Sequence, residues 1–130
     1  MTRTLASSLA LAALALSLGF SPAEAQAKRC FPINELDGWR ASDASTIYLR
    51  VAQTQYYRLD LGNMCPLLTD KGAHIVLKAR GSDLLCSAAD MDLKVARDTH
   101  GSLASPCIVK AMRPLTPAEA QALPKGFQGM

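Results

Sequence analysis

Four cysteines are the residues of this chain whose chemistry is most open: Cys30, Cys65, Cys86 and Cys107. A cysteine can be a nucleophile, a metal ligand or half of a disulfide bond, and each role favours its own spacing. No Cys-x-x-Cys pair is present, although a redox site, a haem attachment site or a zinc ribbon would need one. An even number of widely spaced cysteines in a small exported domain is typical of a disulfide framework. We therefore expect two disulfide bonds.

The pairing of these cysteines is not fixed by the sequence, because four cysteines permit three pairings. We favour Cys65 with Cys86, which would close the middle of the chain. Cys30 would then join Cys107 and tie the N-terminal segment to the last strand. In the loop-entropy picture each bond stabilises the fold by about 2 to 4 kcal/mol, a large share of the stability of a small domain.

The histidines and two neighbouring aspartates are weaker signs of chemistry. His74 and His100 could meet two cysteines at a metal ion, but the oxidising compartment and the lack of a close ligand pair argue against this. Asp90 and Asp92 would share one strand face, as paired carboxylates or a calcium site would, yet a solvated strand edge explains them better. The sequence contains no Gly-x-Ser-x-Gly elbow, His-Glu-x-x-His motif or phosphate loop. We therefore expect no catalytic residues, no metal and no other cofactor.

The N-terminal segment has the three-part plan of a secretory signal peptide. A basic start precedes a short apolar stretch and a small-x-small site at Ala23 and Ala25. The apolar stretch is shorter and more dilute than a membrane-spanning helix of about 20 residues. We predict cleavage after Ala25, with Ala27 as the second choice. Residues 1–25 are then the signal peptide, and residues 26–130 form one small domain.

The residues after the signal bear on where the protein resides. Cys30 lies near the site at which a bacterial lipoprotein would be acylated, but Lys28 and Arg29 stand where that signal needs small apolar residues. The net charge of +3 is spread along the chain, whereas nucleic-acid binders concentrate basic residues on one face. We predict a soluble periplasmic protein with no nucleic-acid partner and no stable membrane insertion after cleavage.

Alternating apolar and polar residues predict five short strands. They span residues 46–52, 55–61, 73–80, 91–97 and 107–112. In the last of them we expect Cys107, Val109 and Ala111 on one side. Together the strands predict a mainly β fold, either a small antiparallel sheet or a partly closed five-stranded barrel, with short flanking helices.

Short helical signals flank these strands. Asn34 can cap one helical turn that Gly38 ends, which makes the single tryptophan, Trp39, a core residue. Near the C-terminus, Thr116-Pro117-Ala118-Glu119 combines an N-cap, a proline in the first turn and a capping-box glutamate, and the helix it starts ends by Pro124. Residues 125–130 are expected to form a frayed tail.

The first two strands are expected to form a hairpin whose register the charges help to choose. Their inward residues are odd-numbered, so the loop must have an odd length. A loop over residues 53–55 would place Arg50 opposite Arg58. A loop over residues 52–54 instead places Tyr48 opposite Arg58. The same register sets Arg50 opposite Tyr56, replacing like-charge repulsion by cation–π pairs of about 0.5 to 1 kcal/mol each. We predict this second register, although its loop lacks the expected glycine.

The outward stripe of this hairpin is the candidate binding surface. Its residues, which we name the Tyr/Arg face, are Tyr48, Arg50, Tyr56 and Arg58. Ordinary cross-strand pairing is the simpler explanation of the same stripe. Our first hypothesis is a non-enzymatic, disulfide-stabilised periplasmic module that binds a protein or envelope component through this face. The alternative is a small periplasmic enzyme, or an accessory protein that depends on a thiol or a metal.

Several spaced motifs also carry a resemblance to a known family. They are Cys30, Trp39, Asp43, Thr46-Ile47-Tyr48, Tyr57-Arg58-Leu59-Asp60-Leu61, Cys65-Pro66-Leu67, Cys86, Asp92-Leu93, Cys107-Ile108-Val109 and Leu115-Thr116-Pro117-Ala118-Glu119. In this order they resemble an uncharacterised family of small exported bacterial proteins with four cysteines and a C-terminal Leu-Thr-Pro helix. The resemblance implies a periplasmic address in Gram-negative bacteria and no assigned activity, so it carries over no catalytic residue.

Overall fold

The computed structural model describes residues 29–98 and 103–130, so the predicted signal peptide and His100 lie outside the described residues. The strands are β1 (Phe31–Pro32), β2 (Leu36–Asp43), β3 (Thr46–Val51), β4 (Gln55–Leu61), β5 (His74–Ala79), β6 (Leu84–Leu85), β7 (Met91–Ala96), β8 (Ser105–Cys107) and β9 (Val109–Pro114). The helical elements are the 3-10 turns η1 (Ile33–Glu35), η2 (Pro66–Thr69) and η3 (Ala88–Asp90) and the α-helix α1 (Pro117–Gln121). None of the helices in the described ranges is long and apolar enough to span a membrane.

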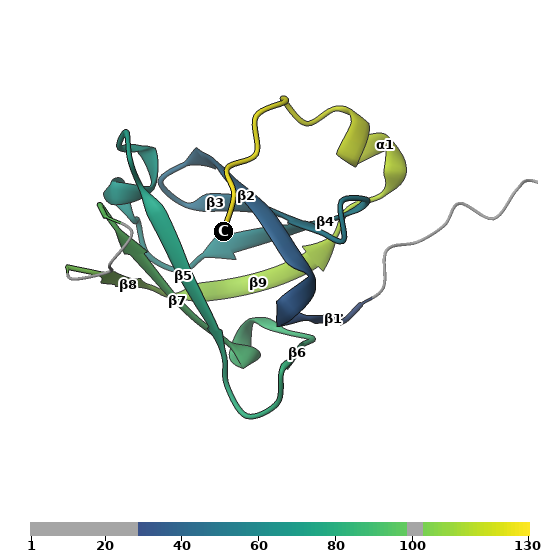
Figure 1. Ribbon diagram of the computed structural model, residues 1–130, viewed down its shortest axis with the longest axis horizontal. Coiled ribbons are helices and arrows are strands. Elements are labelled where there is room, and N and C mark those ends of the chain that lie inside the picture. The colour runs from purple at the N-terminus through teal and green to yellow at the C-terminus, as the bar shows by residue number, and fades with distance from the viewer. Residues whose placement is uncertain (1–28, 99–102) are drawn as a thin grey trace, which may run out of the picture.

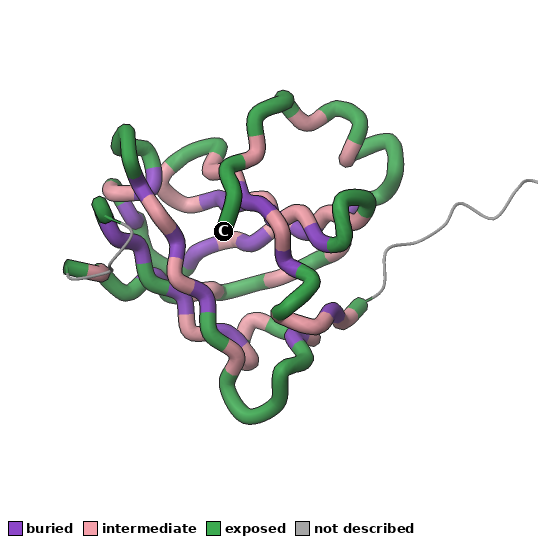
Figure 2. Tube along the Cα trace, viewed as in Figure 1, coloured by how far each residue is buried: buried purple, intermediate pink, exposed green. Residues whose placement is uncertain are grey.

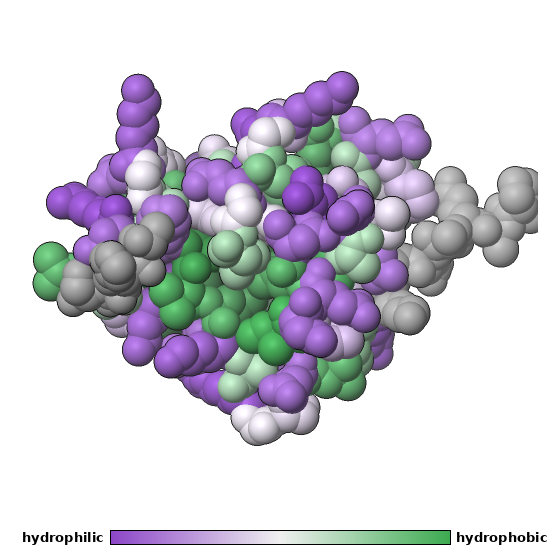
Figure 3. Space-filling model, in the orientation of Figure 1, coloured by the Kyte–Doolittle hydropathy of each residue, from purple (hydrophilic) through white to green (hydrophobic). Residues whose placement is uncertain are grey.

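The strands form three antiparallel sheets, which confirms the mainly β prediction (Figure 1). Their strand orders are β2-β3-β4-β9, β5-β7-β8 and β1-β6. The chain changes from the second sheet to the first between β8 and β9, at Ile108. Within the described residues β2 and β5 are edge strands that do not pair with each other, so the barrel is not closed. Hydrophobic side chains gather on the surface between β5 and the start of β2 (Figure 3).

The core lies between the inner faces of the sheets, where Figure 2 shows the buried positions of the long strands. Ile47 and Leu49 from β3 are completely buried, as is Leu59 from β4. Trp39 is also buried, as predicted for a core residue. Tyr57 brings a hydroxyl into this apolar region, where it donates to the Gln55 side chain over 3.2 Å. Burial raises the pKa of Tyr57.

The hairpin of β3 and β4 has the predicted register. Its opposite pairs include Tyr48 with Arg58 and Arg50 with Tyr56. The loop between the strands contains Ala52 at φ 48° and Gln53 at φ 64°, so two non-glycine residues adopt the left-handed conformation. The carboxylate of Asp37 accepts a hydrogen bond from the Gln53 backbone N–H over 2.6 Å, which holds the turn from the neighbouring strand.

β2 is a strand that the sequence pattern did not predict. The expected helical turn exists, but it is η1, which has Pro32 at its N-cap position without a side-chain cap and ends before Leu36. Register shifts between Leu36 and Gly38 and between Ala41 and Asp43 interrupt the pairing of β2 with β3. Because an extra residue in a strand breaks the two-residue alternation, no periodic signal marks β2 in the sequence.

All four cysteines form disulfide bonds, but the predicted pairing is wrong. The bonds join Cys30 to Cys86 and Cys65 to Cys107, not Cys65 to Cys86 and Cys30 to Cys107. The short β1–β6 pair explains the first bond, because it sets Phe31 opposite Leu85 and so brings the adjacent cysteines together.

The second disulfide bond follows from the corner between β8 and β9. The backbone N–H of Gly62, the residue after β4, donates to the Ile108 carbonyl over 2.8 Å. The side chain of Asn63 accepts from the Ile108 N–H over 2.8 Å. These contacts place the turn that contains Cys65 beside Cys107. Strand partners distant in sequence therefore choose the pairing, and cysteine spacing does not reveal them.

The C-terminal segment, residues 122–130, returns to the sheet, so the expected frayed tail is wrong for its larger part. Trp39 and Gln128 exchange two backbone hydrogen bonds of 2.9 and 2.8 Å. A guanidinium N–H of Arg40 donates to the Lys125 carbonyl. In Figure 1 the segment leads from α1 over the four-stranded sheet and back to β2. Its partners lie on a strand far away in sequence, which the residues of the tail do not indicate.

Candidate functional site

The four residues of the Tyr/Arg face lie together on the outer side of the four-stranded sheet, in two neighbouring rows. The first row crosses all four strands and contains Arg40, Tyr48, Arg58 and Arg113. The second row contains Gly38, Arg50 and Tyr56. The strand register therefore adds two arginines, Arg40 and Arg113, to the predicted stripe.

Three of these arginines have carboxylate partners within the face. Arg50 pairs with Asp37, Arg58 with Asp60 over 2.8 Å, and Arg113 with Glu119 over 3.1 Å. The hydrogen bond that Arg58 donates to the Asp60 carboxylate is the main cause of the raised pKa of Arg58. Arg40 and Lys125 add two cations for which no carboxylate partner is found within the described ranges. The surroundings of the Tyr/Arg face therefore carry an excess of positive charge.

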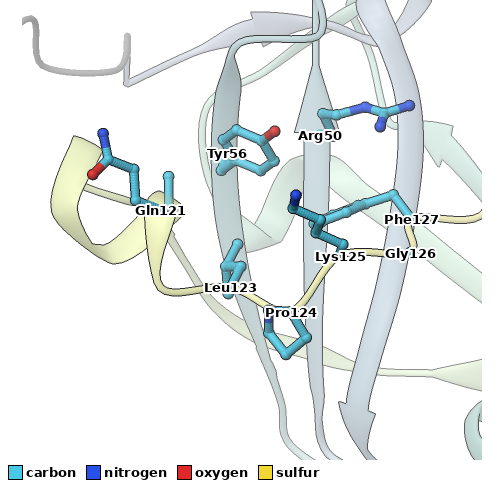
Figure 4. A pocket seen from close by; sticks show the side chains of 9 residues that line it. Arg50, Tyr56, Gln121, Leu123, Pro124, Lys125, Gly126 and Phe127 are labelled. Atoms are coloured by element: carbon cyan, nitrogen blue, oxygen red, sulfur yellow. The ribbon is translucent and has the colours of Figure 1, made fainter.

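A hollow of about 310 Å³ lies beside the Arg50 and Tyr56 pair, and we name it the Phe127 hollow (Figure 4). Its walls are the two strand residues and the chain from α1 to Phe127, including Leu123, Pro124 and Lys125. The ring of Phe127 packs edge-on against Tyr56, with 5.5 Å between centroids. The Arg50 guanidinium lies 5.5 Å from the Phe127 ring centre. This cross-strand pair thus already holds an aromatic side chain of the protein itself.

Two glycines make this close docking possible. A β-carbon at Gly38 would lie 3.1 Å from both the Arg50 guanidinium and the Gln128 carbonyl. Gly126 has φ +110°, and a β-carbon there would lie 3.2 Å from the Arg40 guanidinium. Each glycine therefore leaves room for an arginine of the sheet to reach the C-terminal segment.

A second hollow, of about 360 Å³, lies beside the Tyr48 and Arg58 pair, and we name it the Arg113 hollow. Arg113 and Glu119 line it, together with the side chains of Ser42, Leu115 and Ala122. Leu123 and Pro124 border both hollows and separate them. The C-terminal segment thus divides the Tyr/Arg face into two sites of similar size, each with one tyrosine and one arginine from the hairpin.

Arg113 is a residue of the candidate site that the sequence pattern does not indicate, because the last predicted strand is two strands and the second of them is irregular. A register shift between Asp60 and Leu61 interrupts the pairing of β9 with β4. Ala111, expected on the same side as Cys107 and Val109, is therefore exposed, while Met112 packs against the core. Arg113 consequently shares the outer face with Arg58. A strict two-residue alternation would have placed it on the opposite side.

The other candidate residues do not gather into a site. Asp90 lies in η3, where it accepts from the backbone N–H groups of Cys86 and Ser87, which lower its pKa. The predicted shared strand face is therefore wrong, because only Asp92 lies in β7, where it is 4.0 Å from Arg80. His74 begins β5. Among the described residues no group of three or more potential ligands is arranged to hold a metal ion.

Comparison with known proteins identifies one family. The sequence matches the family of unknown function DUF6491 over residues 1–126. Neither the curated proteins nor the solved structures contain a match to the chain.

Proposed function

The chain belongs to the DUF6491 family of unknown function, and we propose that it is a non-enzymatic periplasmic module that binds a protein or envelope component through the Tyr/Arg face. One observation carries this proposal. The four residues of the face form two cross-strand pairs, and each pair lines a separate hollow of a few hundred cubic ångströms. Excess positive charge, aromatic rings and apolar walls in one place are typical of a recognition surface.

The periplasmic address is supported by the signal-peptide pattern and by the two disulfide bonds, which fit an exported protein. We expect protein purified from the periplasm to begin at Gln26 and to take up no thiol label before reduction. A peptide map should link Cys30 to Cys86 and Cys65 to Cys107. Full labelling without reductant would contradict export into an oxidising compartment and would favour the thiol-dependent alternative.

The binding role can be tested with two variants that remove equal charge from different sheets. The first, Arg50→Ala with Arg58→Ala, changes the Tyr/Arg face. The second, Lys78→Ala with Lys94→Ala, removes two exposed lysines of β5 and β7. Envelope components crosslinked to the wild-type protein in living cells should be lost with the first variant and kept with the second. Equal recovery with both variants would contradict the proposal.

A further inference from the structure

The Arg113 hollow contains a pair of like charges that a purely structural sheet would avoid. Arg58 of β4 stands directly opposite Arg113 of β9. Like charges in opposite positions of an antiparallel pair destabilise it. The pair is tolerated because two carboxylates accompany it: Asp60 from the same strand as Arg58, and Glu119 from α1.

These two carboxylates use only part of the donor capacity of the arginines. Both oxygens of Glu119 accept from a single nitrogen of Arg113, Nη1, over 3.1 Å each. Asp60 receives Nε and Nη2 of Arg58 on one oxygen. Because a guanidinium carries five N–H donors, this arrangement leaves donors on both arginines for another acceptor.

Glu119 is also a partner that water can reach and a ligand can replace. The side chains of Arg113 and Glu119 are 48% and 42% exposed. Exposed ion pairs of this kind contribute little to stability. The helix that carries Glu119 has five residues, and the hollow beside it adds the hydroxyl-bearing side chains of Ser42 and Tyr48.

We propose that the Arg113 hollow binds an oxyanion group of a ligand, a carboxylate or a phosphate, between Arg58 and Arg113, in exchange for Glu119. This inference rests on the proposed binding function and names the chemistry that one part of the Tyr/Arg face recognises. Glu119 is then an internal competitor whose carboxylate occupies Arg113 until a ligand arrives. Planar guanidinium groups suit this role because they bind both kinds of oxyanion through paired hydrogen bonds.

The test is a titration of the full exported protein with succinate and, separately, with inorganic phosphate. Binding is followed by the chemical shifts of backbone amides and arginine Nε–H groups, at an ionic strength held constant with sodium chloride. We expect saturable shifts around Ser42, Arg58 and Arg113 with at least one probe. Binding of succinate alone identifies a carboxylate ligand, and binding of phosphate alone identifies a phosphate-bearing one.

Two substitutions then distinguish replacement of Glu119 by the ligand from a general attraction of anions to the positive charge of the protein. Glu119→Gln removes the competing charge, and because glutamine also serves in a capping box, α1 keeps its N-terminal cap. We expect about fivefold tighter probe binding with this variant, the size of an exposed ion pair, and at least tenfold weaker binding with Arg113→Gln, which loses hydrogen bonds to a charged group. Lys94→Gln, on the other sheet, should bind as the wild type does.

Three results would overturn the inference: no saturable shift with either probe, equal affinity of Glu119→Gln and wild type, or undiminished binding by Arg113→Gln. The proposed function fails separately. If no probe binds while Arg50→Ala with Arg58→Ala still loses its crosslinked partner, only the oxyanion site is wrong. If the probes bind as expected while that variant keeps every partner, the Tyr/Arg face is not the partner-binding surface.

Discussion

Each hollow of the Tyr/Arg face contains one tyrosine and one arginine paired across the hairpin, but the two pairs have different surroundings. In the Phe127 hollow, Arg50 and Tyr56 hold a ring from the C-terminal segment. In the Arg113 hollow, the guanidinium of Arg113, beside Tyr48 and Arg58, holds an exposed carboxylate. Such a pair therefore helps to hold the C-terminal segment in the Phe127 hollow. In the Arg113 hollow the nearby contact between Arg113 and Glu119 can be replaced by a ligand.

The difference lies in what anchors each partner. Backbone hydrogen bonds between Trp39 and Gln128 fix the chain next to Phe127. Gly126 allows that chain to approach Arg40. Glu119 depends on the capping box of α1, in which it accepts from the Thr116 N–H over 2.9 Å. A ligand would therefore displace Glu119 more readily than Phe127.

The largest effect is expected from the disulfide bonds, which do not support the two hollows equally. Replacing either bond by alanines should lower the free energy of unfolding by about 2 to 5 kcal/mol. The Cys65–Cys107 bond lies at the corner that leads into β9 and Arg113. In the NMR spectrum its loss should therefore shift resonances of the Arg113 hollow more than those of the Phe127 hollow. Urea unfolding gives the energies. If the Cys30→Ala with Cys86→Ala variant shifted the resonances of the Arg113 hollow more than loss of the Cys65–Cys107 bond does, the Cys65–Cys107 bond would not be the one that supports this hollow.

Gly126→Ala tests the anchoring of the Phe127 hollow. The substitution forces a β-carbon into a left-handed conformation at φ +110° and against the Arg40 guanidinium. We expect the free energy of unfolding to fall by about 1 to 3 kcal/mol. Gly129→Ala is the matched control, because its β-carbon would meet no atom within 4 Å. Similar losses in both variants would show that the docking of Gly126 is not the cause.

Phe127→Ala removes the ring itself and should lower the free energy of unfolding somewhat less than Gly126→Ala does. The ring makes one edge-on contact with Tyr56 and one cation–π contact with Arg50. Together they predict a loss of about 1 to 2 kcal/mol in the free energy of unfolding. Hydrogen exchange at the Gln128 amide should become faster. Met130→Ala, which changes an exposed side chain of the same segment, should alter neither quantity. Unchanged exchange in Phe127→Ala would mean that the backbone pair alone holds the segment.

The sequence predicts the β3–β4 hairpin, which supplies the Tyr/Arg face, better than it predicts the flanking strands β2 and β9. Strict alternation located β3 and β4, and the cost of opposing Arg50 to Arg58 chose their register correctly. The same alternation failed at β2 and β9, because a register shift moves every following side chain to the other face. The hairpin part of the candidate site was thus predictable from local pattern alone.

The two hollows are bordered by α1 and by the C-terminal segment, and the sequence predicts only the first of these. The capping-box motif predicted α1, because all its partners lie within one turn. The position of Phe127 depends instead on Arg50, Tyr56 and the backbone of Trp39. The cysteine pairing likewise follows from strand partners. Neither arrangement leaves a signal in the spacing of residues, so the hollows themselves could not be predicted.

The smallest expected effect is a difference in how α1 and the C-terminal segment respond to acid. Hydrogen bonds from Arg113 and then from the Thr116 N–H lower the pKa of Glu119 from its ordinary value of 4.5. A carboxylate with a lowered pKa stabilises the fold above its ordinary pKa, and this contribution disappears as the pH falls through the lowered value. Below that pH, α1 should loosen from Arg113. The ring and backbone contacts of Phe127 do not titrate, so the C-terminal segment should stay docked.

Carbon-detected NMR titration of the Glu119 carboxyl measures this effect directly. Arg113→Gln should raise the pKa of Glu119 toward 4.5, because the first cause of the shift is removed. The pKa of Asp90 should stay low in the same variant, since Cys86 and Ser87 lower it from another part of the fold. Amides of α1 should then shift with the Glu119 titration while those near Phe127 and Gln128 do not. If the amides near Phe127 and Gln128 shifted together with those of α1, then α1 and the C-terminal segment would move as one unit. Binding in the Arg113 hollow would then also open the Phe127 hollow.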